Sequence, residues 1–375
     1  IFGDEFIPLH RPVFEGNEKQ YLLDCIDSNF VSSVGERVDD FEDRISKFTT
    51  SKYAIAAVNG TAALHISILL SGVEKGDEVI SQALTFIATC NAISYSGASP
   101  VFIDVDRDTL GMSPLALKNF LETNAEIKNG VTLNKKSGRR ISACIPMHTY
   151  GMPCRVKEIA SICEEWNIPL IEDCAESLGS YVEDRHTGTF GKIGTLSFNG
   201  NKVITTGGGG MLLTDCPELA KKAKHITTTA KVPHPYEFIH DEIAYNYRLP
   251  NLNAALGCAQ MEQLSKFLLL KAQLAEKWDS FFNDYGVFFC KAIENHKSNN
   301  WLNSILFDSK KDRNKFLEYT NENGVMTRPV WKLMNELKMF ENCQHDNLDN
   351  SRWLSERLVN IPSSVPNGSI NNIRG

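Results

Sequence analysis

The stretch AIAAVNGTAALHISILL, residues 54–70, decides the fold because it joins two different patterns across one turn. Its first five residues form a short apolar run typical of a buried strand, and residues 62–70 have the composition of a helix. The residues between them, 59–61, are turn formers. The stretch therefore predicts a strand, a tight turn and a helix in direct succession.

The same alternation of apolar runs and helical segments recurs along the chain as far as residue 214. Further strands are expected at residues 78–80, 100–104, 143–147, 169–173, 195–198 and 211–214, and further helices at residues 88–95 and 156–166. Near-continuous apolar strands joined by helices indicate an α/β fold, in which a mostly parallel sheet is covered on both faces.

The pattern changes near residue 251. A long helix is expected at residues 253–269, and later segments combine helices with strand candidates such as residues 304–307. A chain of 375 residues is also too long for one compact core. We therefore expect a large domain over residues 1–250 and a small C-terminal domain over residues 251–375.

Charge and cysteine usage narrow the functional classes. The formal net charge is -7 without a basic block, which disfavours nucleic-acid binding but allows a small anionic nucleotide as ligand. No apolar run approaches the roughly 20 residues of a membrane span, and the first residues lack the features of a signal peptide. The ten cysteines are scattered without CxxC spacing, so free thiols in a cytoplasmic protein and no metal site are expected.

The turn after the first strand is a candidate phosphate site. Gly60 lets the backbone approach a ligand closely, and the N–H groups of Thr61 and Ala62 follow at the start of the helix, where a phosphate is favoured. Most Gly-Thr turns before helices are only caps, so this turn alone does not assign a function.

Two charged residues follow later strands. Asp173 ends the strand at residues 169–173, where an Asp can pair with a positively charged ring nitrogen or simply cap a helix. Lys202 follows the segment SFNGN, residues 197–201, and precedes four glycines at residues 207–210. A lysine in such a turn can be a reactive amine or a phosphate binder, but the Gly-Lys-Ser/Thr order of a P-loop is missing.

These features indicate more together than they do separately. The turn at Gly60 supplies a phosphate cradle, and Phe86 supplies an aromatic ring for stacking. Asp173 supplies a partner for a ring nitrogen, and Lys202 supplies an amine for a Schiff base. Pyridoxal 5'-phosphate (PLP) needs this set, because the protein tunes its electron sink through a lysine and a ring-nitrogen partner. The sequence therefore predicts a PLP enzyme.

The same motifs resemble those of the DegT/DnrJ/EryC1/StrS family of PLP-dependent sugar aminotransferases. The resemblance extends from FVSSVG at residues 30–35 to RLVNIP at residues 357–362. It implies a fold-type I aminotransferase, with a mostly parallel seven-stranded sheet in the large domain and a smaller α+β C-terminal domain. It also implies a homodimer with shared active sites.

The resemblance assigns cofactor roles to individual positions. Lys202 matches the catalytic Schiff-base lysine, and Asp173 matches the catalytic partner of the pyridine nitrogen. The other cofactor-binding positions that it implies are Gly60, Thr61, Ala62 and Ser197 at the phosphate, Phe86 above the ring, Ala175 beneath it, and Asn246 reaching the phosphate from the other subunit.

On the substrate side, the resemblance implies four further residues, which are Ser33, His148, Tyr150 and Arg328. His148 and Tyr150 match a loop at the sugar, and Arg328 matches a segment of the C-terminal domain near the mouth of the active site. The aromatic residues of that domain, such as Trp331, are expected to be core.

Glu176 departs from the family pattern, which usually has Gln at this position and counts it among the cofactor-binding residues. Gln can donate to the phenolate oxygen of the cofactor, whereas an ionised Glu cannot donate. Glu176 is therefore expected either to be protonated beside the cofactor or to face the substrate amine.

Similarity at residues 199–208 and 227–234 extends to the 4-aminotransferases of bacillosamine and legionaminic acid pathways. It implies that L-glutamate donates an amino group to C4 of a UDP-linked 2-acetamido-4-keto-6-deoxy sugar. The same chemistry on a GDP-linked or dTDP-linked keto-sugar, and a non-catalytic sensor on this fold, are the alternatives. A sugar dehydratase of the family is disfavoured, because it carries His where Lys202 stands.

Overall fold

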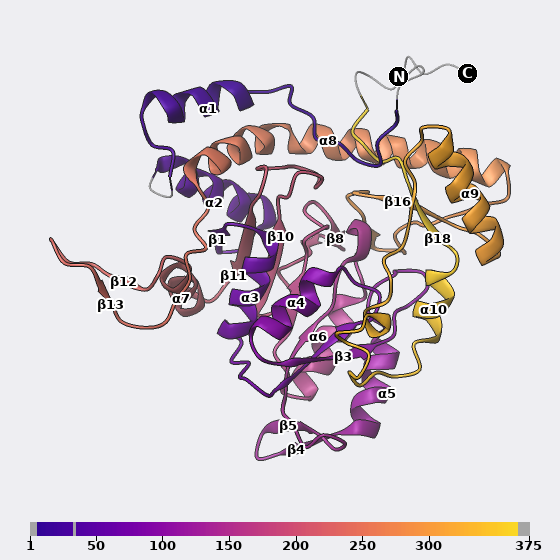
Figure 1. The fold of residues 1–375 in the computed structure, drawn as a ribbon, viewed down its shortest axis with the longest axis horizontal. Helices are drawn as coiled ribbons and strands as arrows, with labels where there is room; N and C mark the ends of the chain where they lie inside the picture. The colour runs from indigo at the N-terminus through magenta and orange to yellow at the C-terminus, as the bar shows by residue number, and fades with distance from the viewer. Residues whose placement is uncertain (1–5, 33–34, 367–375) are drawn as a thin grey trace.

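Two groups of strands form the centre of the molecule. The computed structural model describes residues 6–32 and 35–366 (Figure 1). One sheet has the order β1 (Tyr53–Ala57), β11 (Gly210–Thr214), β10 (Ile193–Ser197) and β7 (Ile171–Asp173). The other has the order β3 (Ser99–Ile103), β2 (Glu78–Gln82) and β6 (Ile141–Ile145). Parallel bridges from Cys144 to Leu170 and from Met147 to Asp173 join the two groups side by side.

The joined sheet of seven strands is mostly parallel. Only β11 runs against its neighbours, since it pairs antiparallel with both β1 and β10. The other pairings, β10 with β7, β2 with β3 and β2 with β6, are parallel. This arrangement confirms the fold class and the seven-stranded sheet expected from the sequence.

Helices cover both faces of this sheet. Val79 packs with residues of α3 (Gly60–Leu70) and α4 (Ile87–Tyr95), whereas its neighbour Ile80 packs with residues of α5 (Pro114–Asn124) and α6 (Val156–Glu165). Successive residues of a strand point to opposite faces. Both faces of β2 are therefore buried, which explains why the strands read as continuous apolar runs.

The α8 helix (Asn251–Asp284) extends across the top of the molecule in Figure 1 and is longer than the sequence predicted. The helices α1 (Glu18–Asp27) and α2 (Glu36–Thr49) pack against it. Beyond α8 lies a four-stranded antiparallel sheet in the order β14 (Phe288–Phe289), β16 (Asn303–Leu306), β18 (Leu358–Ile361) and β17 (Arg328–Pro329), with α9 (Lys310–Glu322) and α10 (Asp349–Ser355) beside it. Ile7 bridges to Val325, so the N-terminal segment lies against this C-terminal part. The division at residue 250 stays a prediction.

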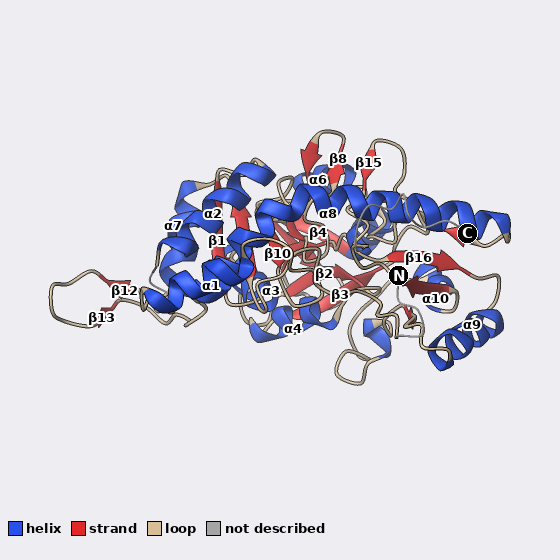
Figure 2. Ribbon diagram, turned by 90° about the horizontal axis from the view of Figure 1, so that it is seen from above, coloured by secondary structure: helices blue, strands red, loops and turns tan. Residues whose placement is uncertain are grey.

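A hairpin of β12 (Lys231–Val232) and β13 (Ile239–His240) projects beyond α7 (Pro217–Thr227), as both overall views show (Figures 1 and 2). The remaining short elements are β4 (Ala125–Lys128), β5 (Val131–Asn134), β8 (Tyr181–Val182), β9 (Arg185–His186), β15 (His296–Lys297) and the 3-10 turns Thr149–Gly151 and Met334–Glu336. Among the described residues, no helix is both long enough and apolar enough to cross a membrane.

Candidate active site

A cavity of about 290 Å³ lies at the carboxyl ends of the central strands. In sheets of this kind, ligands bind beyond those ends. Eight of the predicted cofactor residues line it, namely Gly60, Thr61, Phe86, Asp173, Ala175, Glu176, Ser197 and Lys202. The structure therefore brings into one cavity residues that are spread over more than 140 positions of the chain.

The start of α3 forms the phosphate end of this cavity. Asn59 caps the helix, because its side-chain oxygen accepts the N–H of Ala62 at 2.8 Å. A Cβ added to Gly60 would lie 2.8 Å from the Cβ of Ser197, so a larger residue would force the two loops apart. Because Gly60 and Ser197 lie this close, the N-terminal end of α3 is open to the cavity beside the Ser197 side chain. This end of a helix favours an anion.

Asp173 lies at the end of β7 and is buried. Its Oδ2 accepts the hydroxyl of Thr89 at 2.6 Å, and its Oδ1 accepts the N–H of Ala175 at 3.1 Å. Burial raises the pKa of Asp173 despite these bonds. A cationic ring nitrogen in the cavity would restore the ionised carboxylate, so the site fits the pyridine end of PLP.

Lys202 and Glu176 form a pair on the wall of the cavity. Lys202 Nζ lies 3.3 Å from Glu176 Oε1, and Glu176 Oε2 accepts the backbone N–H of Tyr150 at 2.8 Å. Burial raises the pKa of Glu176 to about 7, although the charge of Lys202 opposes the shift. Glu176 therefore faces the lysine amine and is close to half protonated at neutral pH.

Tyr150 reaches the site through its backbone. Its φ of 58° is in the left-handed region, which is uncommon for a residue with a side chain, and this turn points its N–H at Glu176. The side chain is buried, with its ring centroid 4.8 Å from that of Trp331. The ring does not line the cavity, so a direct contact with the sugar stays a prediction.

His148 is fully buried and is not among the residues that line the cavity, so its predicted place at the sugar stays a prediction. Its Nδ1 accepts the N–H of Cys154 at 3.2 Å, and its Nε2 lies 3.1 Å from a carboxylate oxygen of Glu172. Both residues are fully buried. Glu172 also accepts the N–H of Gly188 at 2.8 Å. With both ring nitrogens engaged, His148 contributes to packing and orientation. Cys174 lies close enough to His148 and Glu172 for the three side chains to resemble a set of metal ligands. Both ring nitrogens of His148 are, however, already engaged by Cys154 and Glu172.

Two other predicted residues, Arg328 and Asn246, are not among the described residues that line this cavity. Arg328 is exposed on β17 and donates to Asn321 at 2.7 Å. Asn246 is exposed at the base of the projecting hairpin and accepts from Arg248 at 3.0 Å. Ser33 lies outside the described residues. Their roles stay predictions, and the role of Asn246 requires a second copy of the chain.

The chain matches the DegT/DnrJ/EryC1/StrS aminotransferase family over residues 12–368. It belongs to this family. The GDP-perosamine synthase of Escherichia coli O157:H7 is 34% identical over 367 residues, which cover 96% of this chain and 93% of that one. The putative pyridoxal phosphate-dependent aminotransferase EpsN of Bacillus subtilis strain 168 is 35% identical over 364 residues, which cover 97% of this chain and 91% of that one.

Solved structures have the same fold. The aminotransferase TlmJ from Streptoalloteichus hindustanus superposes with a TM-score of 0.86 at 24% identity, covering 96% of this chain and 93% of that one. Aminotransferases of the DegT/DnrJ/EryC1/StrS family depend on PLP and act on sugars. The comparisons therefore confirm the family, the enzyme class and the cofactor that the sequence predicted.

The sequence missed several residues of this aminotransferase site. Trp301 and Trp331 both line the cavity, and Trp331 also packs against the hydrophobic core, as the sequence predicted. Thr89, in the first turn of α4, holds Asp173, and its position three residues after the predicted Phe86 was a signal that could have found it. Trp301 offered no such signal, because its partner in the lysine loop, Asn201, is 100 residues away.

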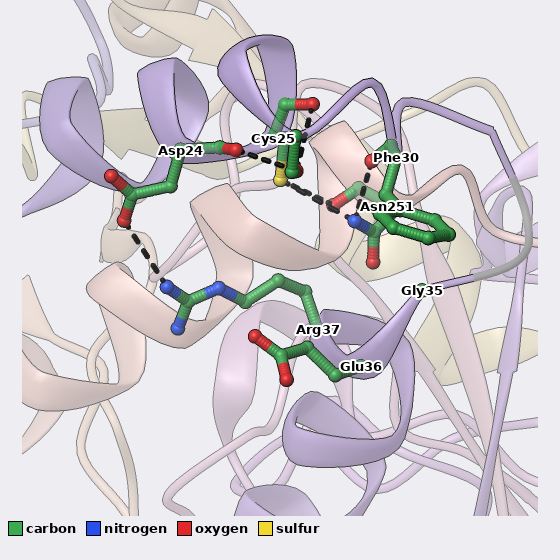
Figure 3. Close-up of a pocket in the computed structure, with 8 residues that line it drawn as sticks. Asp24, Cys25, Phe30, Gly35, Glu36, Arg37 and Asn251 are labelled. Carbon is green, nitrogen blue, oxygen red and sulfur yellow. Dashed lines mark hydrogen bonds and ion pairs between the residues drawn. The ribbon is translucent and has the colours of Figure 1, made fainter.

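A second cavity, of about 350 Å³, lies between α1, α2 and the start of α8 (Figure 3). Arg37 points across it toward Asp24 at 3.4 Å, and the amide nitrogen of Asn251 donates to the carbonyl of Phe30 at 2.6 Å. These contacts stabilise the packing of the helices. None of the predicted catalytic residues lies there, so we assign the chemistry to the first cavity.

Proposed function

We propose that the chain transfers the amino group of L-glutamate to C4 of a nucleotide-linked 4-keto-6-deoxy sugar. The observation that carries the proposal is the amine of Lys202, which shares one cavity with the buried Asp173 and lies 3.3 Å from Glu176. An amine, an ion partner for a ring nitrogen and a phosphate cradle in one place are what a PLP transaminase needs.

Each residue has one task in this account. Bound PLP supplies an electron sink for the α-carbon of the amino donor. Asp173 holds the proton on the ring nitrogen, because an opposite charge within hydrogen-bond reach favours the charged form. Lys202 Nζ takes a proton from the α-carbon of the donor and later gives the proton back to complete the transfer. Glu176, with a pKa of about 7, exchanges a proton with Lys202 Nζ.

For the acceptor, a GDP-linked keto-sugar is favoured over the UDP-linked acetamido sugar that the sequence suggested. The support is the 34% identity to a GDP-perosamine synthase over nearly the full length of both chains. The product would then be a GDP-linked 4-amino-4,6-dideoxy sugar of the perosamine type. The UDP-linked sugar is the second candidate, because residues 199–208 resemble the UDP-sugar enzymes.

The active sites are shared in a homodimer in this proposal. The hairpin that projects beyond α7 carries Tyr236 and Phe238, each 82% exposed, and Ile243, three residues after β13, is 93% exposed. Large apolar side chains this exposed favour burial against another surface. A second copy of the chain would cover them and bring Asn246 toward its phosphate cradle.

The direct test is a product assay with the purified protein, PLP and ¹⁵N-labelled L-glutamate. GDP-, UDP- and dTDP-linked 4-keto-6-deoxy sugars are supplied separately, and the products are analysed by mass spectrometry. We expect the fastest ¹⁵N incorporation with the GDP-linked sugar and none with Lys202→Ala. Incorporation of ¹⁵N only into the UDP-linked sugar would make that sugar the acceptor in place of the GDP-linked one. No incorporation into any of the three, with the ¹⁵N-labelled glutamate recovered intact, removes the aminotransferase proposal.

A further inference from the structure

Trp301 lies directly over the amine of Lys202. The Nζ atom is 3.9 Å from the centroid of the Trp301 ring, within the range of a cation–π contact. We propose that Trp301 is a positioning residue that holds Lys202 Nζ in the direction of the PLP aldehyde. This inference rests on the proposed function, because it concerns the lysine that binds the cofactor.

The Trp301 ring is fixed to the loop that carries Lys202. Its Nε1 donates to the carbonyl oxygen of Asn201, the residue just before the lysine, at 2.6 Å. The side chain is also almost completely buried. A buried indole that donates to the neighbouring backbone cannot change its rotamer without breaking that hydrogen bond. The position of the ring relative to Lys202 is therefore fixed.

The backbone around Trp301 is tied to the Glu176 loop as well. Asn299 Oδ1 accepts the N–H of Trp301 at 2.8 Å, and Asn299 Nδ2 donates to the carbonyl oxygens of Glu176 at 2.8 Å and Leu178 at 2.9 Å. One short segment therefore fixes both members of the Lys202–Glu176 pair. Buried networks whose members are all hydrogen-bonded are rigid.

A buried lysine anchors this segment from the other side. Lys271 of α8 donates through Nζ to the carbonyl oxygens of Trp301 at 3.2 Å and Ser363 at 2.5 Å. Lys271 is 1% exposed, and the burial of such a side chain costs free energy unless its donors are paired. A continuous chain of contacts thus leads from α8 through the Trp301 backbone and ring to the reactive amine.

The ring restricts the space open to Lys202 Nζ. The indole lies against the amine on one side and Glu176 on another, in the same cavity that Asp173 lines. A nucleophile that is already oriented reacts faster, because the entropic cost of orienting it has been met before the reaction begins. Trp301 therefore acts on the step in which Lys202 Nζ, having passed its extra proton to Glu176, condenses with the PLP aldehyde. A C=N bond forms, the C=O bond of the aldehyde breaks, and water leaves.

The test follows that condensation by absorbance after PLP is added to PLP-free protein. Trp301→Leu removes the ring, and Trp301→Phe keeps an aromatic face. We expect condensation to slow on the order of tenfold in Trp301→Leu and by less than about threefold in Trp301→Phe. Pyridoxamine phosphate, which has no aldehyde, is the control ligand; its affinity should change by less than about twofold.

Two results would overturn the inference. One is condensation of Trp301→Leu at the wild-type rate. The other is an equal loss of pyridoxamine phosphate affinity, which would mean that Trp301 shapes the whole cavity and does not act through Lys202. If Trp301→Leu does not fold, Trp301→Met keeps more volume and carries the same comparison. Failure of the wild-type protein to condense with PLP would contradict the proposed function itself, so the two failures are distinguishable.

Discussion

Glu176 and Lys202 face each other across 3.3 Å in the wall of the cavity, and the carboxyl group has a pKa of about 7 because it is buried. Glu176 therefore holds a proton in the native state that the unfolded chain releases between about pH 4.5 and pH 7. The stabilisation from this proton is complete below that window and is lost as the pH rises through it.

The first prediction concerns the pH dependence of stability in PLP-free protein. Glu176→Gln removes this titration, so the variant should gain stability relative to wild type as the pH rises from 5 to 7, by on the order of 2 kcal/mol. Urea unfolding at several pH values measures the difference. Glu74→Gln, at an exposed site, is the control. A difference that stays constant with pH contradicts the assignment.

The second prediction concerns Lys271, whose effect on stability changes with pH in the opposite direction to that of Glu176. Burial lowers its pKa to about 7, so between about pH 7 and pH 10.5 the unfolded chain binds a proton that the native protein lacks. Wild type should therefore gain stability relative to Lys271→Met as the pH rises from 7 to 9, by about 1.4 kcal/mol per pH unit at most. The exposed Lys266→Met, on the same helix, is the matched control. An unchanged gap between wild type and Lys271→Met over this pH range contradicts the prediction.

Asp173→Asn tests the ring-nitrogen partner. The substitution keeps the size of the side chain but removes the charge that would hold the ring proton. We expect transamination to fall at least about 100-fold, while circular dichroism shows a folded protein, because burial already disfavours the charge. Activity within a few-fold of wild type would mean that another group supplies this proton.

Shared active sites predict complementation between two defective variants. Lys202→Ala lacks the amine, and Asn246→Ala lacks the residue expected to reach the phosphate of the other subunit. Refolding the two as an equal mixture should restore about a quarter of the wild-type activity, since half of the dimers are mixed and each mixed dimer has one intact site. Recovery no greater than that of the two separate variants is the result expected if each chain completes its own site.

The sequence predicted those parts of the site that depend on local pattern. The strand, turn and helix around Gly60 follow from a short apolar run, turn-forming residues and helical composition, and Asp173 and Lys202 follow from their places after strands. His148 also follows a strand, but its ring contacts the buried Glu172, which strand position alone does not reveal. Trp301 was missed because its contact with Lys202 forms only when the C-terminal part folds onto the large sheet.

The central claim is that Lys202 binds PLP and shuttles an amino group, and the visible absorption spectrum tests it most directly. Protein incubated with PLP should show the band of the lysine-linked cofactor. L-Glutamate should abolish that band, and a GDP-linked 4-keto-6-deoxy sugar should restore it. Folded wild-type protein that shows no such band with PLP, or the same band in Lys202→Ala, would contradict the account.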